Sequence, residues 1–373
     1  MPKKILITYA SAGAGHKRAA EAAAGALRKK YKDVKIELWD ILDYSSFLFQ
    51  KTYSAIYLFA ITYMPLIWGM VYLVLDNPVI YFIISPLRRL INKLNSRRFV
   101  QFLGQLDPDV VISTHFYSSE VIAHQRRNNR YRGRLISVIT DFRTHSFWLA
   151  RGIDKFVVAV QSTKKELIKK GIDQNKIEVL GIPIGHAFGE PKNKDLLLEK
   201  LGLQKGLFTI LVVSGGLGVG PIEELVAELE GLSRPAQLII VCGNNKPLYQ
   251  KLSNKQLKIP GKVYGFSRNM HELMAVSDVI VGKSGGLTSS ECLASNSPLI
   301  IVAPVPGQET RNCDVLAGEK AVLKIKKAGE IRGLVIELLD NPQELDRIKE
   351  NIRRIAKPNS ALDLAGLAIG MKD

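Results

Sequence analysis

The stretch Ile5-Leu-Ile-Thr-Tyr-Ala-Ser-Ala-Gly-Ala-Gly-His16 decides the fold of this chain. Its first five residues form a short apolar run that is typical of a buried β-strand, and glycines follow almost at once. The next segment, Lys17–Tyr31, is rich in alanine and has helical spacing. A strand, a glycine loop and a helix in this order open an α/β domain built on a parallel sheet.

The second half of the chain repeats this pattern at Val212-Val-Ser-Gly-Gly-Leu-Gly-Val-Gly-Pro221, with the proline at a helix start. Further apolar runs indicate the other strands. They are Lys35–Trp39, Val110–Ser113, Leu135–Thr140, Lys155–Val160 and Lys176–Leu180 in the first half, and Phe208–Val213, Gln237–Cys242, Lys262–Tyr264, Val279–Val281 and Pro298–Val302 in the second. The sequence therefore predicts two doubly wound α/β domains, at 1–185 and 195–355, and a helical tail at 356–373.

Length and composition fit a globular protein with two cores. The chain has 373 residues, of which 46% are apolar and 23% charged, and this excludes a largely disordered protein. The three cysteines, Cys242, Cys292 and Cys313, cannot form a disulfide framework and fit a reducing compartment. The start of the sequence shows no export signal, because its apolar run is only a few residues long. We therefore expect a cytoplasmic location.

The net charge of +17 is concentrated in the first half of the chain. Residues 1–185 carry 28 lysines and arginines against 14 acidic residues, whereas residues 186–373 carry 24 against 21. Such a surplus favours an anionic partner, either a nucleic acid or an anionic membrane. The aromatic residues lie in apolar runs and do not alternate with basic residues on a strand, so we expect no nucleic acid.

An apolar and basic insertion at about residues 44–106 interrupts the first domain. Thr52–Leu75 contains no charged residue and is long enough to cross a bilayer as a helix, about 36 Å. One crossing would separate the first strand from its sheet, and Pro65 breaks the run. The pattern therefore favours an interfacial or re-entrant helical hairpin, with a core helical pair as the alternative. The residues expected to associate with the membrane are Tyr57, Trp68, Tyr72, Arg88, Arg89 and Lys93.

Glycine-rich and polar runs follow several predicted strands of the second half. They are GGLGVGP at 215–221, GFSRNM at 265–270, VGKSGGLTSSE at 281–291 and PVPGQETRN at 304–312. Because each run begins where a strand ends, all should meet at the carboxyl edge of the sheet, where open α/β sheets bind ligands. Backbone N–H groups at the helix starts favour a phosphate there.

Two side chains near these loops suit a chemical role. His16 lies at a helix start, where an imidazole can accept a proton near neutral pH, although a helix-capping histidine is the alternative. Glu291, one helical turn after Thr288, is placed to accept hydrogen bonds from two ribose hydroxyls, with a surface glutamate as the alternative. Asp107-Pro-Asp109 precedes a strand and reads as a turn, so no metal site is expected there.

Four motifs taken together resemble one known family. The Gly-His pair at 15–16, the GGLGxGP loop, the SGGLTSSE run at 284–291 and the PGQExxN run at 306–312 are similar to the diacylglycerol glycosyltransferases, which include monogalactosyldiacylglycerol synthase and the processive diacylglycerol glucosyltransferases. A more distant similarity extends to the peptidoglycan lipid-intermediate N-acetylglucosaminyltransferase. The resemblance spans about residues 5–355. It implies a GT-B fold, in which two Rossmann-like domains face a cleft.

The resemblance also implies roles for individual residues. His16 would be the general base of the N-terminal, acceptor-binding domain, with Asp141 and His145 lining the acceptor side. In the C-terminal domain, Phe266 would lie against the uracil and Glu291 would bind the ribose hydroxyls. The residues near the diphosphate would be Gly216, Gly218, Ser284, Gly285, Gly286, Leu287 and Thr288. The residues facing the donor sugar would be Gln308, Glu309 and Asn312.

The expected reaction follows from these roles. It is an inverting transfer of a hexose from UDP-glucose or UDP-galactose to diacylglycerol or a glycosyldiacylglycerol, at the inner face of the cell membrane. Helix termini and basic groups can stabilise the departing UDP, so we expect no cofactor and no metal. A polyprenyl-linked acceptor, a soluble UDP-sugar epimerase and a non-enzymatic UDP-sugar sensor at the membrane are the alternatives. The sequence departs from the family at Ala14 and in the expanded segment 47–87.

Overall fold

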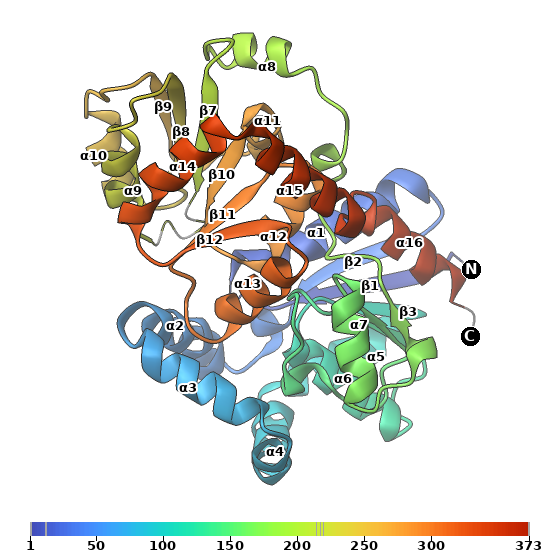
Figure 1. Cartoon of the computed structure of the whole chain (residues 1–373). Coiled ribbons are helices and arrows are strands. Elements are labelled where there is room, and N and C mark those ends of the chain that lie inside the picture. Colours follow the sequence, from blue (N-terminus) through green and yellow to red (C-terminus); the bar gives the residue numbers. More distant parts are fainter. Residues whose placement is uncertain (1, 12, 214, 217, 219, 372–373) are drawn as a thin grey trace. The chain divides into compact units, whose positions relative to one another are not determined.

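The computed structural model describes residues 2–11, 13–213, 215, 216, 218 and 220–371, and the chain divides into two compact units (Figure 1). Unit 1 comprises Met1–His186, Val305–Arg311 and Asn359–Asp373, and unit 2 comprises Ala187–Pro304 and Asn312–Pro358. Each unit contains its own parallel sheet of six strands with helices packed on it. The predicted doubly wound α/β architecture is therefore confirmed in both halves.

The sheet of unit 1 has the order β2-β1-β3-β4-β5-β6, with every neighbouring pair parallel. Its strands are β1 (Lys4–Tyr9), β2 (Lys35–Asp40), β3 (Val110–Ser113), β4 (Arg134–Val138), β5 (Lys155–Val157) and β6 (Ile177–Glu178). All six overlap predicted strands, although β5 and β6 are shorter than expected. The order reverses between β1 and β3, so the loops after these two strands meet at the carboxyl edge.

Helices cover both faces of this sheet. Outside the insertion they are α1 (Ala14–Lys30), α6 (Phe116–Arg127), α7 (Gln161–Lys169) and α16 (Ser360–Gly370), with short 3-10 helices η1 (Ile41–Tyr44), η2 (Ser146–Trp148) and η3 (Gln174–Lys176). Ile5 and Ile7 face a core shared with α1 and α16, whereas Leu6 faces the opposite core. This alternation is the period of two that a strand buried on both faces imposes.

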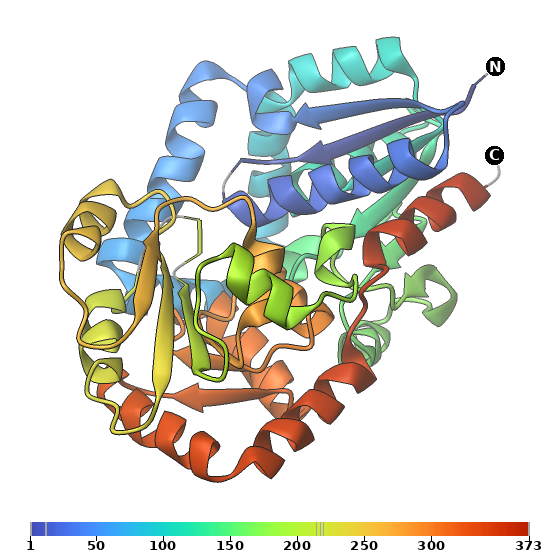
Figure 2. The same cartoon turned by 90° about the horizontal axis from the view of Figure 1, so that it is seen from above.

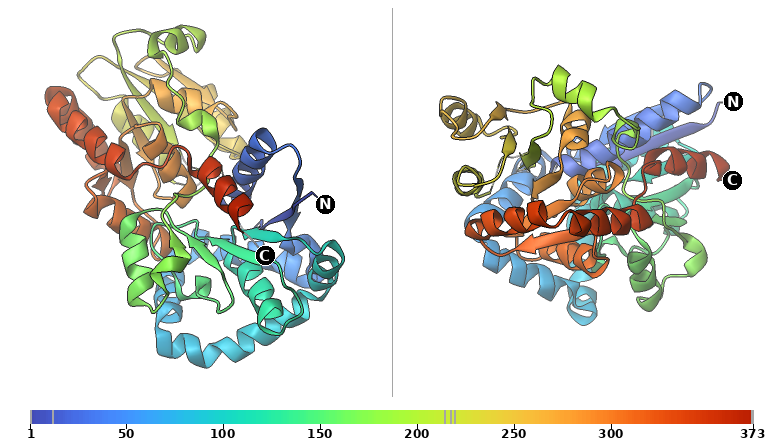
Figure 3. Two further views of the ribbon diagram at one scale, coloured as in Figure 1. Left: turned by 90° about the vertical axis from the view of Figure 1, so that its right-hand side faces the viewer. Right: turned by 45° about the horizontal axis from the view of Figure 1, so that its top comes forward.

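The insertion forms four consecutive helices of unit 1: α2 (Phe47–Tyr63), α3 (Pro65–Asp76), α4 (Pro78–Asn95) and α5 (Arg97–Leu106). The cyan part of this insertion runs along the bottom of the left view of Figure 3. The chain bends by 118° between α2 and α3, where Pro65 begins the new helix. Within the described ranges no helix by itself is long and apolar enough to cross a membrane, and α2 with α3 meet those criteria only as this bent pair.

The sheet of unit 2 has the order β12-β11-β10-β7-β8-β9 and is also parallel throughout. Its strands are β7 (Phe208–Val213), β8 (Ala236–Val241), β9 (Gly261–Tyr264), β10 (Val279–Gly282), β11 (Leu299–Val302) and β12 (Val322–Ile325). The first five were predicted. The edge strand β12 was not, because its run is short and includes the charged Lys324. Here the order reverses between β7 and β10.

The helices of unit 2 alternate with these strands. They are η4 (His186–Phe188), α8 (Lys194–Lys200), α9 (Ile222–Leu229), α10 (Lys246–Ser253), α11 (Met270–Val276), α12 (Gly286–Ala294), α13 (Gln308–Gly318), η5 (Ala328–Glu330), α14 (Ile331–Asp340) and α15 (Pro342–Ile355). Ile210, Val212 and Ile240 lie in a core with α9 and α14. The first residue of η4, His186, and the first four residues of α13, Gln308–Arg311, belong to unit 1.

The division into units differs from the predicted boundaries in two places. Residues 305–311 were expected in the second domain, yet they group with unit 1. The helix α16, expected as a separate tail, packs on α1 (Figure 2). Its Leu364, Ala365 and Ala368 are fully buried in the core that contains Ile5 and Ile7. Helix α16 therefore completes the core that β1 and α1 begin.

We predict that Leu364→Ala destabilises unit 1 by about 2–4 kcal/mol, because a fully buried leucine is replaced by a cavity. The three tryptophans, Trp39, Trp68 and Trp148, all lie in unit 1, so tryptophan fluorescence during urea unfolding reports on this unit. Leu90→Ala is the control, since Leu90 is 52% exposed. Equal midpoints for the two variants would contradict the prediction.

Candidate functional site

The loops after β1 and β3 bring His16 against Thr114 in unit 1. The His16 Nδ1 atom lies 2.9 Å from the Thr114 carbonyl oxygen and 2.9 Å from the Thr140 hydroxyl oxygen. The Thr114 hydroxyl in turn donates to the His16 carbonyl oxygen at 2.9 Å. Both polar groups of Thr114 therefore fix the first turn of α1, and the sequence prediction that His16 sits at a helix start is confirmed.

These contacts determine the tautomer of the His16 ring. A carbonyl oxygen cannot donate a hydrogen bond, so the contact with Thr114 requires the proton to be on Nδ1. The neutral ring then carries its lone pair on Nε2. An imidazole held in this way can accept a proton from a hydroxyl group at Nε2.

The surroundings of His16 favour its neutral form. Burial lowers the pKa of the imidazole below the usual 6.5, and the charge of Asp141 and the Thr114 carbonyl only partly oppose this effect. The ring of His115 lies edge-on at 4.6 Å, and burial and the neighbouring His16 hold the pKa of His115 well below its usual value. At neutral pH His16 is therefore uncharged and able to act as a base.

Asp141 and Gln308 lie together in unit 1. The Gln308 side-chain amide donates to Asp141 Oδ1 at 2.6 Å, and the Asp141 side chain is buried. The sequence assigned these residues to opposite sides of the reaction, Asp141 to the acceptor and Gln308 to the donor sugar. The structure brings them into direct contact, one residue from the threonine that contacts His16. Glu309 accepts the backbone N–H of Val305 at 2.8 Å and so closes the turn that precedes α13.

His145 has a different environment from His16. Its Nε2 donates to the Tyr72 carbonyl oxygen at 3.0 Å, and its Nδ1 accepts from the Phe147 N–H at 3.1 Å. Burial lowers the pKa of His145 to about 4. Since both ring nitrogens are engaged, His145 fastens α3 to the loop after β4 and offers no free base.

The aromatic residues expected at the membrane point inward. Tyr57 and Trp68 meet at 5.4 Å, Trp68 and Tyr72 at 6.3 Å, and Tyr72 and His145 at 4.4 Å between ring centroids. Each of these rings is only partly exposed. They form a stack that joins the bent pair α2 and α3 to the loop after β4. Hydropathy identified the segment but not the direction in which these side chains face.

The basic residues of α4 fall into two groups. Arg88 forms an ion pair with Glu120 at 3.0 Å and lies over the rings of Tyr81 and Phe147. Its side chain is largely buried, so Arg88 is part of the packing of unit 1. Arg89 and Lys93 are exposed, and their association with a membrane stays a prediction.

In unit 2 the glycine loop after β7 packs against the loop after β8. Gly218 has a φ of +69°, and a Cβ atom there would lie 2.4 Å from the Cys242 carbonyl oxygen and from the Asn245 Cβ. The Asn245 amide donates to the Gly218 carbonyl at 2.9 Å, and Gly216 accepts from the Asn244 N–H at 3.1 Å. Only glycine fits at position 218, because any side chain would collide with backbone. A pocket of about 550 Å³ adjoins this loop and is lined by Gly218 and Gly220 of the loop and by Lys251 of α10.

The loop after β10 lies beside the glycine loop because β10 pairs with β7. It leads into α12, whose N-cap Gly285 has no side chain to bind the first N–H groups of the helix. These groups and the helix dipole favour an anion. The Asn312 amide donates to the buried Ser284 carbonyl at 3.1 Å and so holds the loop from the other side. Gly286 and Leu287 are buried, and Thr288 is partly exposed.

Lys283 is a further candidate that the sequence reasoning missed. A Cβ atom on Gly220 would lie 3.5 Å from the Lys283 Cε, so this side chain reaches the glycine loop. Within the described part of the chain Lys283 has no acidic partner. A lysine directly after a strand and before a glycine-capped helix was the available signal. Its ammonium group suits a phosphate beside the α12 N-terminus.

Two further side chains with predicted roles lie in the segments that follow β9 and β10. Glu291, on α12, is 4% exposed and so is not a surface glutamate. Phe266, in the loop after β9, is 55% exposed, which is unusual for a large ring and leaves a face for an aromatic base. Among the described residues no group of three or more His, Cys, Asp or Glu side chains is arranged to hold a metal ion.

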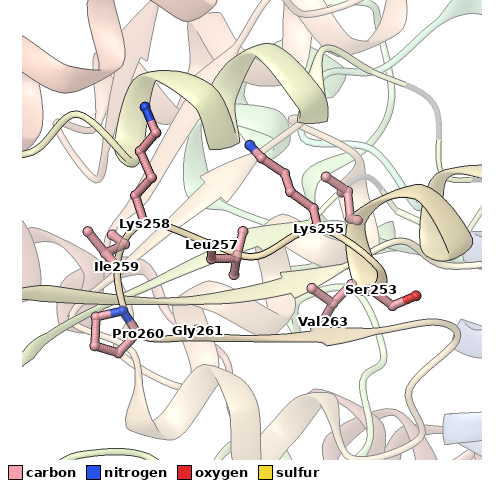
Figure 4. Close-up of a pocket in the computed structure, with 9 residues that line it drawn as sticks. Ser253, Lys255, Leu257, Lys258, Ile259, Pro260, Gly261 and Val263 are labelled. Carbon is pink, nitrogen blue, oxygen red and sulfur yellow. The ribbon is translucent and has the colours of Figure 1, made fainter.

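A second pocket, of about 460 Å³, lies at the opposite edge of this sheet, where β9 begins. Figure 4 shows Lys255 and Lys258 extending to the same side of it, with Leu257 and Pro260 beside them. Glu230 forms an ion pair with the Lys255 ammonium and accepts a hydrogen bond from the Lys258 N–H at 3.0 Å. Because it lies away from the glycine loops, this pocket is not part of the candidate site.

Comparison with known proteins places these features in a family. The model of the monogalactosyldiacylglycerol (MGDG) synthase family matches residues 16–184, and that of the glycosyltransferase family 28 C-terminal domain matches residues 209–363. The processive diacylglycerol beta-glucosyltransferase of Bacillus licheniformis is 30% identical over 274 residues, which cover 72% of this chain and 70% of the relative.

Solved structures agree on the fold. Acinetobacter baumannii MurG superposes with a TM-score of 0.65 and 18% identity over 99% of this chain and 100% of that one. Anabaena HepE in complex with UDP-glucose gives a TM-score of 0.56 and 13% identity over 98% of this chain and 99% of that one. The fold is therefore the expected GT-B fold.

We predict that the His16 imidazole titrates below pH 6.5 and that Asp141→Asn lowers its midpoint further. The wild-type carboxylate favours the protonated ring, so removing its charge must shift the pKa down. NMR titration of the histidine side-chain resonances measures both midpoints. Asp43→Asn, which changes an exposed carboxylate of the same unit, is the control. A midpoint above 6.5, or one unaffected by Asp141→Asn, would contradict the environment described for His16.

Proposed function

Because the chain belongs to the diacylglycerol glycosyltransferase family and is a hexosyltransferase, we propose that it transfers glucose or galactose from a UDP-sugar to diacylglycerol or a glycosyldiacylglycerol with inversion. The observation that carries the proposal is the pair of half-sites. Among the residues that the structure describes, unit 1 holds a neutral histidine whose Nε2 makes no hydrogen bond, and unit 2 offers a glycine-capped helix start for an anion, with an exposed aromatic ring and a buried carboxylate. A base and a nucleotide site are the two parts that glycosyl transfer requires.

His16 is the proposed general base. Its Nε2 accepts the proton of the acceptor hydroxyl as the hydroxyl oxygen bonds to the anomeric carbon of the sugar. The bond from that carbon to the UDP oxygen breaks, and the electron pair leaves with UDP. The Thr114 carbonyl and the negative charge of Asp141 stabilise the imidazolium that forms. Direct displacement inverts the anomeric carbon, so an α-linked UDP-sugar gives a β-glycoside.

Unit 2 supplies the stabilisation of the leaving group. The diphosphate fits at the N-terminus of α12 and beside the glycine loop, with Lys283 as a counter-charge. The uracil would stack on Phe266, and Glu291 would accept the ribose hydroxyls. These positive groups suffice for a diphosphate anion, so we propose that transfer needs no metal ion or other cofactor.

We propose that unit 1 binds a membrane surface through α4. The polar side of this helix faces inward and its apolar side faces outward. Ser85, Arg88 and Asn92 lie on the inner side, where Asn92 donates to Glu120 at 2.7 Å and Arg88 pairs with the same carboxylate. The outer side is apolar and consists of Val79, Phe82, Ile83, Leu87, Leu90, Ile91 and Leu94, each at least 41% exposed. A helix with its apolar stripe facing outward is stable next to lipid and unfavourable next to water.

The charge around this apolar side complements an anionic bilayer. The only acidic residue between positions 44 and 106 is Asp76, and it is buried in ion pairs. The exposed charges of the segment are all basic: Lys51, Arg89, Lys93, Arg97 and Arg98. Each basic group near anionic lipid contributes about 1 kcal/mol. We therefore propose peripheral binding to the inner face of the cell membrane, where a diacylglycerol acceptor lies.

We predict that the purified protein, incubated with labelled UDP-glucose or UDP-galactose and diacylglycerol in mixed micelles, yields a labelled glycolipid. His16→Ala should lower turnover about a hundredfold or more, because the proton then has no acceptor. UDP affinity, measured by calorimetry, should stay unchanged in this variant, since the nucleotide is bound by unit 2.

The same assay separates the alternatives. Label on a polyprenyl phosphate but not on diacylglycerol would replace the acceptor class. UDP-sugar binding without any labelled lipid would favour a non-enzymatic sensor. No labelled product with either UDP-sugar and any lipid would overturn the proposed reaction, and full turnover in His16→Ala would remove His16 from it.

For membrane binding, we predict that Ile83→Glu combined with Leu87→Glu lowers co-sedimentation with phosphatidylglycerol vesicles by tenfold or more. Burial of a leucine or isoleucine is worth about 1.5–3 kcal/mol, and two such contributions are lost. Both residues are more than 60% exposed, so the fold should tolerate the change. Leu196→Glu, at a 64% exposed leucine of unit 2, is the matched control. Equal sedimentation of the two variants would show that α4 is not the helix that binds the vesicle surface.

A further inference from the structure

The segment 305–311, which carries Gln308, packs closely on α3 within unit 1. A Cβ atom on Gly69 of α3 would lie 2.5 Å from the Pro306 Cβ, and one on Gly307 would lie 3.2 Å from the Tyr72 side chain. Gly307 also has a φ of +99°, which favours glycine. Two glycines on opposite sides of this contact therefore let the backbone of the segment approach α3.

Asp76, the last residue of α3, fastens the same segment by its charge. Its Oδ2 accepts from Arg311 Nη2 at 2.5 Å, and its Oδ1 accepts from the Ser146 N–H at 2.7 Å and the Ser146 hydroxyl at 2.8 Å. The two side chains of the ion pair are 9% and 13% exposed. Burial alone would raise the pKa of Asp76, but the bonds from Ser146 and Arg311 outweigh it and hold the pKa below its usual value.

Arg311 and Gln308 stand one helical turn apart at the start of α13. Fixing the Arg311 side chain on Asp76 therefore fixes the orientation of the turn from which Gln308 reaches Asp141 at 2.6 Å. Among the residues that the structure describes, Asp76 forms hydrogen bonds and ion pairs with neither His16 nor the glycine loops. Its effect on the site has to pass through Arg311 and this turn.

We propose that Asp76 is a positioning residue for the donor sugar. It holds the first turn of α13 on α3, so that Gln308 and Glu309 are preset to meet the hexose. The inference rests on the proposed function, in which the hexose of the UDP-sugar contacts this turn. It adds that selectivity for UDP-hexose over UDP depends on unit 1, because α3 holds the turn that meets the hexose. The outer residues of α3, Leu66, Met70 and Leu73, are exposed and apolar.

The test compares UDP with UDP-glucose and UDP-galactose. In Asp76→Asn the amide oxygen can still accept from Ser146, but Arg311 loses its counter-charge and the turn is released. The dissociation constant for the UDP-hexose and its KM should rise tenfold or more, whereas the dissociation constant for UDP, which has no hexose, should change less than twofold. Calorimetry and steady-state kinetics on the full-length protein give these values.

Asp154→Asn is the matched control. Asp154 accepts a backbone N–H from Leu135 at 2.7 Å and pairs with Arg126, and these side chains are 19% and 16% exposed. This pair lies in the same unit but holds α6 and β4, away from residues 305–311. A general loss of stability should be similar in both variants, while only Asp76→Asn should separate UDP-hexose from UDP. Arg311→Lys, which keeps the charge with fewer donors, should show a smaller shift in the same direction and serves if Asp76→Asn does not fold.

The outcomes are distinct. Wild-type protein that binds UDP but gains no affinity from either hexose would overturn the proposed donor and this inference with it. Wild-type protein that binds and transfers the hexose, with Asp76→Asn and Arg311→Lys unchanged in KM, would overturn the inference alone. A similar loss for UDP and UDP-hexose, or for Asp76→Asn and Asp154→Asn, would reduce Asp76 to a structural ion pair.

Discussion

The reversal of strand order in each sheet is the constraint on which both half-sites depend. In unit 1 it places the loop after β1 beside the loop after β3, and the bond between His16 and the Thr114 carbonyl exists only because of that neighbourhood. In unit 2 the same reversal places the glycine loop beside Lys283 and the start of α12. The carboxyl ends of parallel strands all lie at one edge of the sheet. The loops that carry the polar groups therefore meet at this edge, where the strand order reverses.

The insertion shows how a polar interaction can determine the direction of an apolar surface. Glu120 is buried, and its carboxylate requires Arg88 and Asn92 of α4 as partners. Leaving such a charge unpaired would cost several kcal/mol, so the polar side of α4 must face inward. Its apolar side then has to face outward, whatever hydropathy alone would favour. The buried ion pair thus orients α4, while the aromatic rings of α2 and α3 hold the bend.

Local patterns sufficed for much of this structure. Short apolar runs identified all strands except β12, and the ends of these strands located His16, Phe266 and Glu291 in loops or on helices at the correct edge. What failed was information about direction and distance. Hydropathy could not tell that Tyr57, Trp68 and Tyr72 face inward. The membership of 305–311 in unit 1 depends on Gly69 and Asp76, which are more than 200 residues away in sequence, and no local pattern encodes such a pairing.

The place of α16 has a consequence for synthesis of the protein. Unit 1 draws its core from both ends of the chain, whereas unit 2 lies almost wholly between them. The ribosome synthesises the segments in order, so unit 2 can fold before α16 is made. During that time Leu364 and its neighbours do not yet cover the alanine face of α1. Until α16 emerges, that face and the apolar helices of the insertion are exposed together. The N-terminal half therefore has to keep this apolar surface from aggregating until α16 has been made.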